Sequence, residues 1–175
     1  SARMVAAGLQ ELQGVQGMQK NYVGKQDQGV LDRVADVDTD MRRVVMEPGG
    51  AVLYNYKSGD RLSDVAERHS DEKYGVGKMF QLMAQCRGLV LSQGQVVSRP
   101  VQRFIRMVEI GGQGGLAETM LAKTVTEKLD GQMVCGAVIK DAVELWSRGG
   151  RTEVGKAATM VARENKGMLE LINEV

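Results

Sequence analysis

The chain has 175 residues, of which 43% are hydrophobic and 26% are charged, and its formal net charge is +1. These values predict a globular domain with a buried core. They exclude a strongly basic or acidic chain, so any surface for a nucleic acid must come from local clustering of charge. No apolar run is long enough to span a bilayer and no secretory signal is visible. We therefore expect no membrane partner and an intracellular, reducing compartment.

Residues 1–42 are expected to form a helical and loop extension that precedes the main domain. Apolar residues recur at roughly helical spacing between Met4 and Met18, and a polar segment rich in Gly and Gln follows over residues 21–29. A further helical face would be lined by Leu31, Val34, Val37, Met41 and Val44. Three aspartates, at positions 36, 38 and 40, interrupt this last pattern.

These aspartates, together with Glu47, stand at positions 1, 3, 5 and 12 of a calcium-loop template. The template requires glycine where Met41 stands, so we interpret the segment as a solvated acidic stretch and not as a metal site. His69 is the single histidine, and we expect it to be an exposed residue at the end of a helix.

The rest of the chain predicts three antiparallel hairpins and three helices. Turn-forming residues separate the paired strands 43–47 and 51–56, 87–91 and 96–97, and 133–139 and 142–146. Apolar residues with helical spacing predict helices over 62–66 and 76–83 and from residue 152 onward. Hairpins mixed with helices, without regular alternation of strand and helix, predict an α+β fold.

The two cysteines, Cys86 and Cys135, form neither a metal-binding pattern nor a disulfide framework. Each lies in an apolar stretch that is typical of a strand, so we expect two buried, reduced thiols.

The segment Glu127-Lys128-Leu129-Asp130-Gly131 carries the residues with the clearest chemical potential. A deprotonated lysine is a covalent catalyst when it lies next to an electrophile. A phosphoanhydride is such an electrophile once Mg²⁺ and cationic side chains neutralise it. The glycine allows the backbone to turn tightly beside a nucleotide.

This segment resembles the Lys-x-Asp-Gly motif of the covalent nucleotidyltransferases, which comprise RNA ligases, DNA ligases and mRNA capping enzymes. Three upstream segments narrow the resemblance: Val-Leu-Tyr-Asn-Tyr at 52–56, Cys-Arg-Gly-Leu-Val at 86–90 and Val-Ser-Arg-Pro-Val-Gln-Arg-Phe at 97–104. Their order is similar to that in ATP-dependent RNA ligases of the phage and tRNA-repair type. The resemblance covers about residues 50–175. It implies that residues 43–175 are the N-terminal part of a nucleotidyltransferase (adenylation) domain.

The resemblance assigns Lys128 as the catalytic nucleophile that becomes linked to AMP. Arg87 would contact the triphosphate of ATP, and Arg103 would neutralise the leaving pyrophosphate in place of the family's lysine. Arg148 lies 148 − 128 = 20 residues after the nucleophile, where the family has a phosphate-contacting lysine. Arginine preserves the charge and can grip phosphate through two hydrogen bonds.

Two further residues would bind the nucleotide by the same resemblance. Glu127 would accept a hydrogen bond from the adenine amino group, and Gly131 would allow close approach to the ribose and phosphate. The chain departs from the family at Ile105, where an aromatic residue often stacks on adenine, and at Gln132, where serine is frequent.

The implied function is RNA ligation with ATP and Mg²⁺ as cofactors and RNA ends, including those of tRNA, as partners. Family enzymes continue with glutamate-bearing strands and a Lys-x-Lys strand, which this sequence does not contain. Either the chain is a fragment, or another chain supplies these motifs, or the protein is a ligase-derived, non-catalytic structural or RNA-binding subunit. Besides an RNA ligase and a non-catalytic subunit, a third interpretation is a DNA ligase or an mRNA capping enzyme. The nucleotide that the protein uses, ATP, NAD or GTP, would distinguish these enzymes from one another.

Overall fold

The computed structural model describes residues 23–46, 49–101, 103, 127, 130–139 and 142–165. Several predictions lie outside these residues, namely the helix over 4–18, the nucleophile Lys128 and the positions Glu47 and Ile105.

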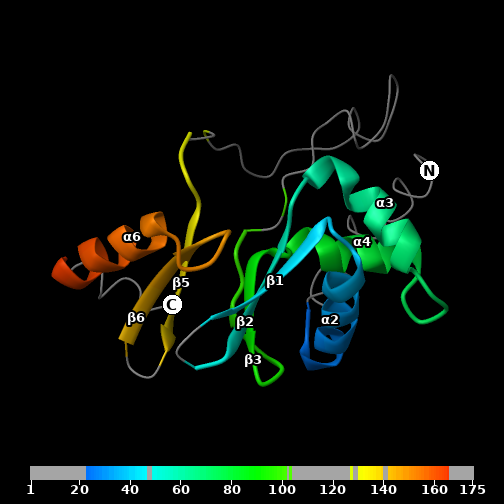
Figure 1. Cartoon of the computed structure of the whole chain (residues 1–175), viewed down its shortest axis with the longest axis horizontal. Coiled ribbons are helices and arrows are strands. Elements are labelled where there is room, and N and C mark those ends of the chain that lie inside the picture. Colours follow the sequence, from blue (N-terminus) through cyan, green and yellow to red (C-terminus); the bar gives the residue numbers. More distant parts are fainter. Residues whose placement is uncertain are drawn as a thin grey trace.

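A four-stranded antiparallel sheet lies at the centre of the molecule, with its strands in sequence order (Figure 1). The strands are β1 (Met41–Met46), β2 (Ala51–Tyr56), β3 (Arg87–Ser92) and β4 (Gln95–Ser98). The first two predicted hairpins are therefore confirmed. The turn between β3 and β4 has positive φ at both Gln93 (51°) and Gly94 (77°), the pattern of a type I′ two-residue hairpin turn.

A β-bulge interrupts the pairing of β2 with β3. Tyr54 pairs with Leu89 and Asn55 pairs with Arg87, so Gly88 has no partner in the ladder. Gly88 has φ +93°, a conformation that side chains other than glycine rarely adopt. The bulge bends the strand locally and changes the direction of the neighbouring Arg87.

Three helices pack against one face of the sheet. They are α2 (Gln28–Val37), α3 (Leu62–His69) and α4 (Val76–Gln85), and short 3₁₀ turns, η2 (Lys25–Asp27) and η3 (Gly59–Arg61), precede the first two. The predicted helices at 62–66 and 76–83 are confirmed. On this face Tyr54, Tyr56, Leu89 and Leu91 of the sheet share a core with Leu31, Val34, Leu62, Val65, Met79 and Met83 of the helices.

The predicted helical face from Leu31 to Val44 is correct only as far as α2 extends. The helix ends at Val37, whose side chain is 72% exposed, and Met41 and Val44 belong to β1. Asp38 explains the end of the helix, because its Oδ1 accepts a hydrogen bond from the Asp40 N–H at 2.9 Å. Such local side-chain acceptors favour turns over helix continuation.

The opposite face of the sheet carries the third predicted hairpin, which is also confirmed. Its strands are β5 (Val134–Ile139) and β6 (Ala142–Ser147), and α6 (Glu153–Glu164) packs against β6. Thr152 begins α6 by accepting a hydrogen bond from the Gly155 N–H. Gly155 allows close packing, since an added Cβ would lie 2.8 Å from the Cα of Trp146.

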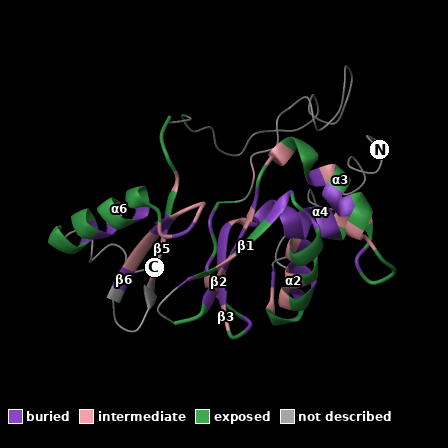
Figure 2. Cartoon of the chain, viewed as in Figure 1, coloured by how far each residue is buried: buried purple, intermediate pink, exposed green. Residues whose placement is uncertain are grey.

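A second core joins this hairpin to the sheet. Its buried members are Met46, Ala51, Leu53, Val90, Cys135 and Trp146. Trp146 is completely buried, and its indole N–H donates to the Gly88 carbonyl at 3.5 Å. Figure 2 shows buried residues along the central strands and the inner faces of the helices, with exposed residues on the outer faces.

The fold is α+β, with antiparallel hairpins packed with helices, as predicted. The division of the chain at residue 42 stays a prediction; in the described part, α2 and β1 share one core with the remainder of the sheet. Among the described residues, no helix has both the length and the apolar character needed to cross a membrane.

Candidate functional site

Arg148 lies in the turn after β6, where the hairpin meets the end of β2. Its Nε donates to Asn55 Oδ1 at 3.1 Å, and its Nη2 donates to the Tyr56 carbonyl at 2.8 Å. The guanidinium also lies 4.8 Å from the centre of the Tyr56 ring, a favourable cation–π distance. The side chain is therefore fixed from three directions.

Arg87 reaches the same region from β3. It stands directly opposite Asn55, and residues opposite each other in an antiparallel pair share a face of the sheet. Leu53 of β2 is in the core with the hairpin, so Asn55 and Arg87 also lie on the side that faces the hairpin. Burial lowers the pKa of Arg148, and the positive charge of Arg87 lowers it further.

Arg103 approaches from the segment that follows β4. Its backbone N–H donates to the Ala84 carbonyl at 3.1 Å, which ties this segment to the end of α4. Its side chain is only 10% exposed and packs against Gly59. Its Nη2 lies 4.0 Å from Asp60 Oδ1.

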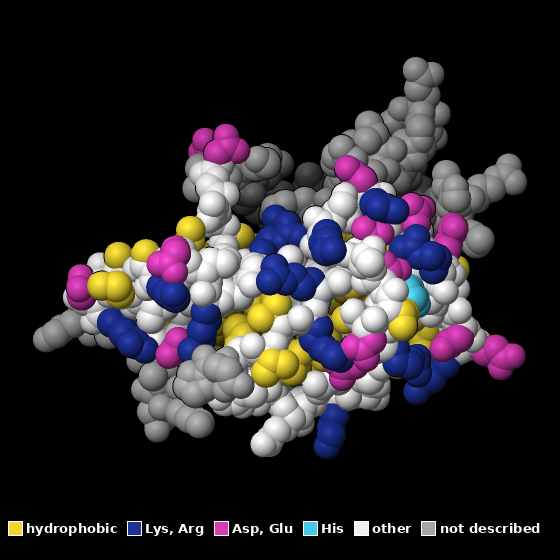
Figure 3. Space-filling view, in the orientation of Figure 1, with side chains coloured by type: hydrophobic (Ala, Val, Ile, Leu, Met, Phe, Trp, Pro, Cys, Tyr) yellow, Lys and Arg dark blue, Asp and Glu magenta, His cyan; other side chains and the backbone are white. Residues whose placement is uncertain are grey.

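The positive charges of these three arginines all act on Tyr56. Burial raises the pKa of the Tyr56 hydroxyl, and the positive charges of Arg148, Arg87 and Arg103 act against that rise. We call Arg87, Arg103 and Arg148 the arginine cluster. Figure 3 shows Lys and Arg side chains gathered over the middle of the molecule, between the hairpin and the helices.

The remaining predicted site residues precede β5. Glu127 is exposed, and Gly131 is exposed with φ +154° and open space where a Cβ would stand. Lys128 lies outside the described residues. The charges of three of the predicted residues, the members of the arginine cluster, thus act on one side chain, Tyr56. The structure leaves the placement of the nucleophile untested.

Asn55 and Tyr56 are site residues to which sequence reasoning gave no role. They lie in the segment Val52-Leu53-Tyr54-Asn55-Tyr56, where Asn55 is the one polar side chain in a largely buried strand. That break in an apolar strand is a signal that could have identified Asn55. Tyr54 does not belong to this site. Its hydroxyl donates a hydrogen bond to Asp32 Oδ1 of α2 at 2.7 Å, on the face of the sheet that the helices cover.

The acidic segment after α2 is not solvated as predicted. Asp38 and Asp40 are each 8% exposed. Arg68 Nη2 lies 2.7 Å from Asp38 Oδ2 and 3.4 Å from Asp40 Oδ2. His69 does end α3, but its side chain is only 20% exposed and its Nε2 lies 2.8 Å from Asp38 Oδ2. The expectation of an exposed histidine is therefore wrong.

The charge of Asp38 is set by two opposing influences. Burial raises the pKa of its carboxyl, while hydrogen bonds from the Asp40 N–H, Arg68 and His69 lower it. The hydrogen bonds prevail, and the pKa falls below its ordinary value of 3.8. In the part of the chain that the structure describes, no three His, Cys, Asp or Glu side chains gather as a metal-binding group.

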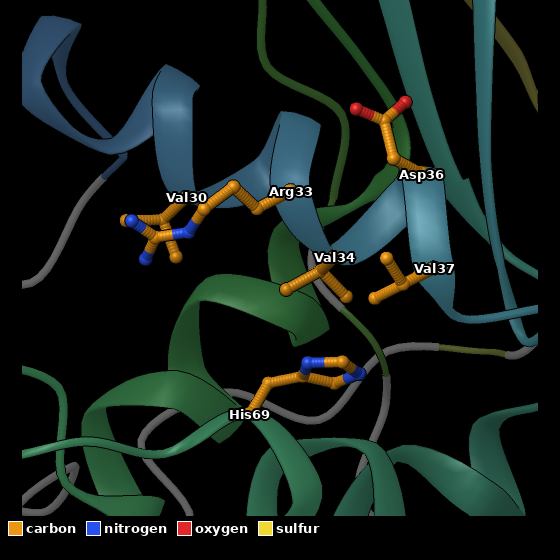
Figure 4. Close-up of a pocket in the computed structure, with 6 residues that line it drawn as sticks. All are labelled: Val30, Arg33, Val34, Asp36, Val37 and His69. Atoms are coloured by element: carbon orange, nitrogen blue, oxygen red, sulfur yellow. The ribbon is translucent and has the colours of Figure 1, made fainter.

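A shallow hollow of about 350 Å³ lies beside this network, between α2 and the end of α3 (Figure 4). Val30, Arg33, Val34, Asp36, Val37 and His69 line it. None of the predicted site residues that the structure describes lines this hollow, so it is separate from the arginine cluster.

Both cysteines are buried free thiols, as predicted. Burial raises the pKa of the Cys86 thiol and of the Cys135 thiol, although Arg87 and Arg148 act against the rise at Cys135. Neither thiol is therefore an activated nucleophile.

No protein-family model, curated protein or solved structure matches the chain.

Proposed function

We propose that the chain carries the nucleotide-binding part of an ATP-dependent RNA ligase, which forms a lysyl-AMP intermediate at Lys128. The observation that supports the proposal best is the arginine cluster. Residues 87, 103 and 148 are far apart in the sequence, yet the positive charge of each of them acts to lower the pKa of Tyr56. Arg148 lies 4.8 Å from the centre of the Tyr56 ring, and Arg87 pairs with the neighbouring Asn55. The motif resemblance assigns each of the three arginines to a phosphate group of ATP or of the leaving pyrophosphate.

The electrostatics of the cluster suit a ligand with several negative charges. Like charges in a partly buried site repel one another, and a polyanion that binds among them relieves the repulsion. Arginine donates paired hydrogen bonds to phosphate oxygens, so a triphosphate matches both the charge and the geometry of the donors.

In the proposed step, the neutral amine of Lys128 attacks the α-phosphorus of ATP. An N–P bond forms, the bond from the α-phosphorus to the bridging oxygen breaks, and pyrophosphate leaves with that electron pair. The amine releases its proton to solvent. The arginine cluster stabilises the charge that develops on the leaving pyrophosphate.

Mg²⁺ would arrive with the nucleotide. The described residues include no carboxylate cluster that fits a divalent cation, so we assign no step to a protein-bound ion. When bound to the phosphates, Mg²⁺ would neutralise their charge.

The AMP would then pass from Lys128 to the 5′-phosphate of an RNA end, and a 3′-hydroxyl would displace it to seal the strand. RNA ends, tRNA among them, are the proposed substrates. The Glu127 carboxylate and the Gly131 backbone are the proposed contacts to the adenosine part of ATP.

The test is covalent labelling. The longest product of the gene is incubated with Mg²⁺ and ATP labelled at the α-phosphate, denatured, and examined for retained label. We expect label in the unmodified protein and none in Lys128→Ala, whereas Lys123→Ala serves as the matched lysine control. We expect Arg87→Ala, Arg103→Ala and Arg148→Ala each to lower labelling about 10-fold or more, because each removes a charge-assisted contact.

Label that persists in Lys128→Ala would reject this nucleophile. An unlabelled, folded protein that binds RNA would reject catalysis and support the ligase-derived, non-catalytic alternative. Arg33→Ala removes an exposed arginine on α2 and should label normally, so equal loss in this variant would point to a general effect of charge.

A further inference from the structure

We infer that Asn55 is a positioning residue, which together with Tyr56 orients the guanidinium of Arg148 as a preformed receptor for an anion. The inference rests on the proposed function only for the identity of the anion, a polyphosphate chain. The geometry of the receptor comes from contacts between described residues.

The contacts of Arg148 use only part of its hydrogen-bonding capacity. An arginine side chain has five N–H donors in a rigid plane. One on Nε is donated to Asn55 and one on Nη2 to the Tyr56 carbonyl. Among the described residues, no partner accepts from Nη1. With respect to the described part of the chain, three donors at the end of the plane, two on Nη1 and one on Nη2, remain for a bound anion.

The described partners of Arg148 are neutral, which distinguishes it from three arginines that pair with carboxylates. Arg43, Arg68 and Arg163 lie within 3.2 Å of carboxylate oxygens, which compensate their charge. Arg148 instead contacts an amide oxygen, a main-chain carbonyl and an aromatic ring, and no carboxylate in the described structure pairs with it. Within the described residues, its positive charge is therefore left for a ligand.

Preorganisation follows from this arrangement. A long side chain that is free on the surface loses rotational freedom when it binds, and that loss weakens affinity. Asn55 and Tyr56 fix the guanidinium before a ligand arrives, next to the like charge of Arg87. The arrangement thus favours anion binding without contact between Asn55 and the anion.

The experiment measures binding of inorganic tripolyphosphate to the full chain by isothermal titration calorimetry, with the melting temperature of each variant recorded. We expect Arg148→Ala to weaken binding about 10-fold or more, and Asn55→Ala to weaken it about 3- to 10-fold. Asn55→Asp keeps the acceptor but pairs Arg148 with a carboxylate. It should therefore weaken binding at least as much as alanine does, although the tether itself is stronger.

A double-variant cycle separates positioning from general destabilisation. If Asn55 acts through Arg148, Asn55→Ala adds no further loss in the Arg148→Ala background. Gln95→Ala, which removes an exposed amide on β4, and Arg33→Ala, which removes a distant charge, should bind tripolyphosphate as the unmodified chain does.

Three outcomes would overturn the inference: unchanged affinity in Asn55→Ala, an equal loss in both backgrounds, or no tripolyphosphate binding by the unmodified chain. The ligase proposal is judged separately by lysyl-AMP labelling. Coupling of Asn55 to Arg148 without labelling would support the receptor and reject the ligase. Labelling without this coupling would support the ligase and reject the positioning role.

Discussion

Gly88 combines a positive φ with a position between the sheet and the hairpin. It adopts φ +93° in the bulge opposite Asn55, and it also lies against the hairpin. An added Cβ would stand 3.4 Å from the Cα of Arg148 and 3.7 Å from the Sγ of Cys135. These distances are ordinary van der Waals contacts, so the backbone conformation is what requires glycine beside the arginine cluster.

We predict that Gly88→Ala lowers the free energy of unfolding by about 1–3 kcal/mol, mainly because a side chain at this φ is strained. Urea unfolding followed by circular dichroism measures the change. Gly75→Ala is the matched control, because its backbone has φ −58° and nothing lies within 4 Å of the added Cβ. An equal loss in both variants would show that strain at Gly88 is not the cause.

The motif resemblance points to Arg87, Arg103 and Arg148 but not to the residues that hold Arg148 in place. Their role toward a nucleotide stays a prediction, and in the structure the charges of all three act on Tyr56. Asn55 was part of the motif but had no assigned role. Its contact with Arg148 joins residues 93 positions apart, and only the packing of the hairpin on the sheet creates it.

The hairpins were predictable because their turns are encoded locally. Gln93-Gly94 fits a turn with positive φ, and apolar strands flank it on both sides. The end of α2 was harder to predict, since apolar spacing continues through Met41 while the chain has already turned. There a partly buried ion network that includes Arg68, 30 residues away, fixes the acidic side chains and overrides the local pattern.

That network connects two elements and should make stability depend on pH. The folded pKa of Asp38 lies below its ordinary 3.8, so its carboxylate stabilises the fold above about pH 4. The contribution is lost as pH falls through the lowered pKa. We predict that Asp38→Asn lowers the free energy of unfolding by about 1–3 kcal/mol at pH 7, and that the difference from the unmodified chain shrinks below pH 4.

Urea unfolding at a series of pH values tests this prediction. The control is Asp36→Asn, because Asp36 pairs with Arg43 at 2.7 Å but is 55% exposed. Exposed ion pairs contribute about 0–1 kcal/mol. A difference for Asp38→Asn that stays constant down to pH 2 would contradict the assigned linkage.

At the scale of the whole molecule, one sheet serves two cores. The helices cover one face, the β5–β6 hairpin covers the other, and Trp146 is the largest side chain in the second core. The arginine cluster lies where the hairpin meets the sheet, so the site exists only while both layers are packed together.

We predict that the hairpin and the helical layer unfold in one transition. Trp146 is the single tryptophan, so its fluorescence reports on the hairpin, whereas far-UV circular dichroism reports mainly on the helices. The two denaturant midpoints should coincide. Val161→Ala, at a 57% exposed position of α6, should leave both midpoints in place. A fluorescence change at lower denaturant would show that the hairpin opens first.

The two buried thiols give each core its own chemical reporter. Cys86 belongs to the helical core and Cys135 to the hairpin core, and burial raises the pKa of both. An alkylating reagent reaches each sulfur only when its own layer opens. A brief pulse of reagent followed by peptide mass analysis would therefore time the opening of each layer separately, in the native chain and without any engineered label.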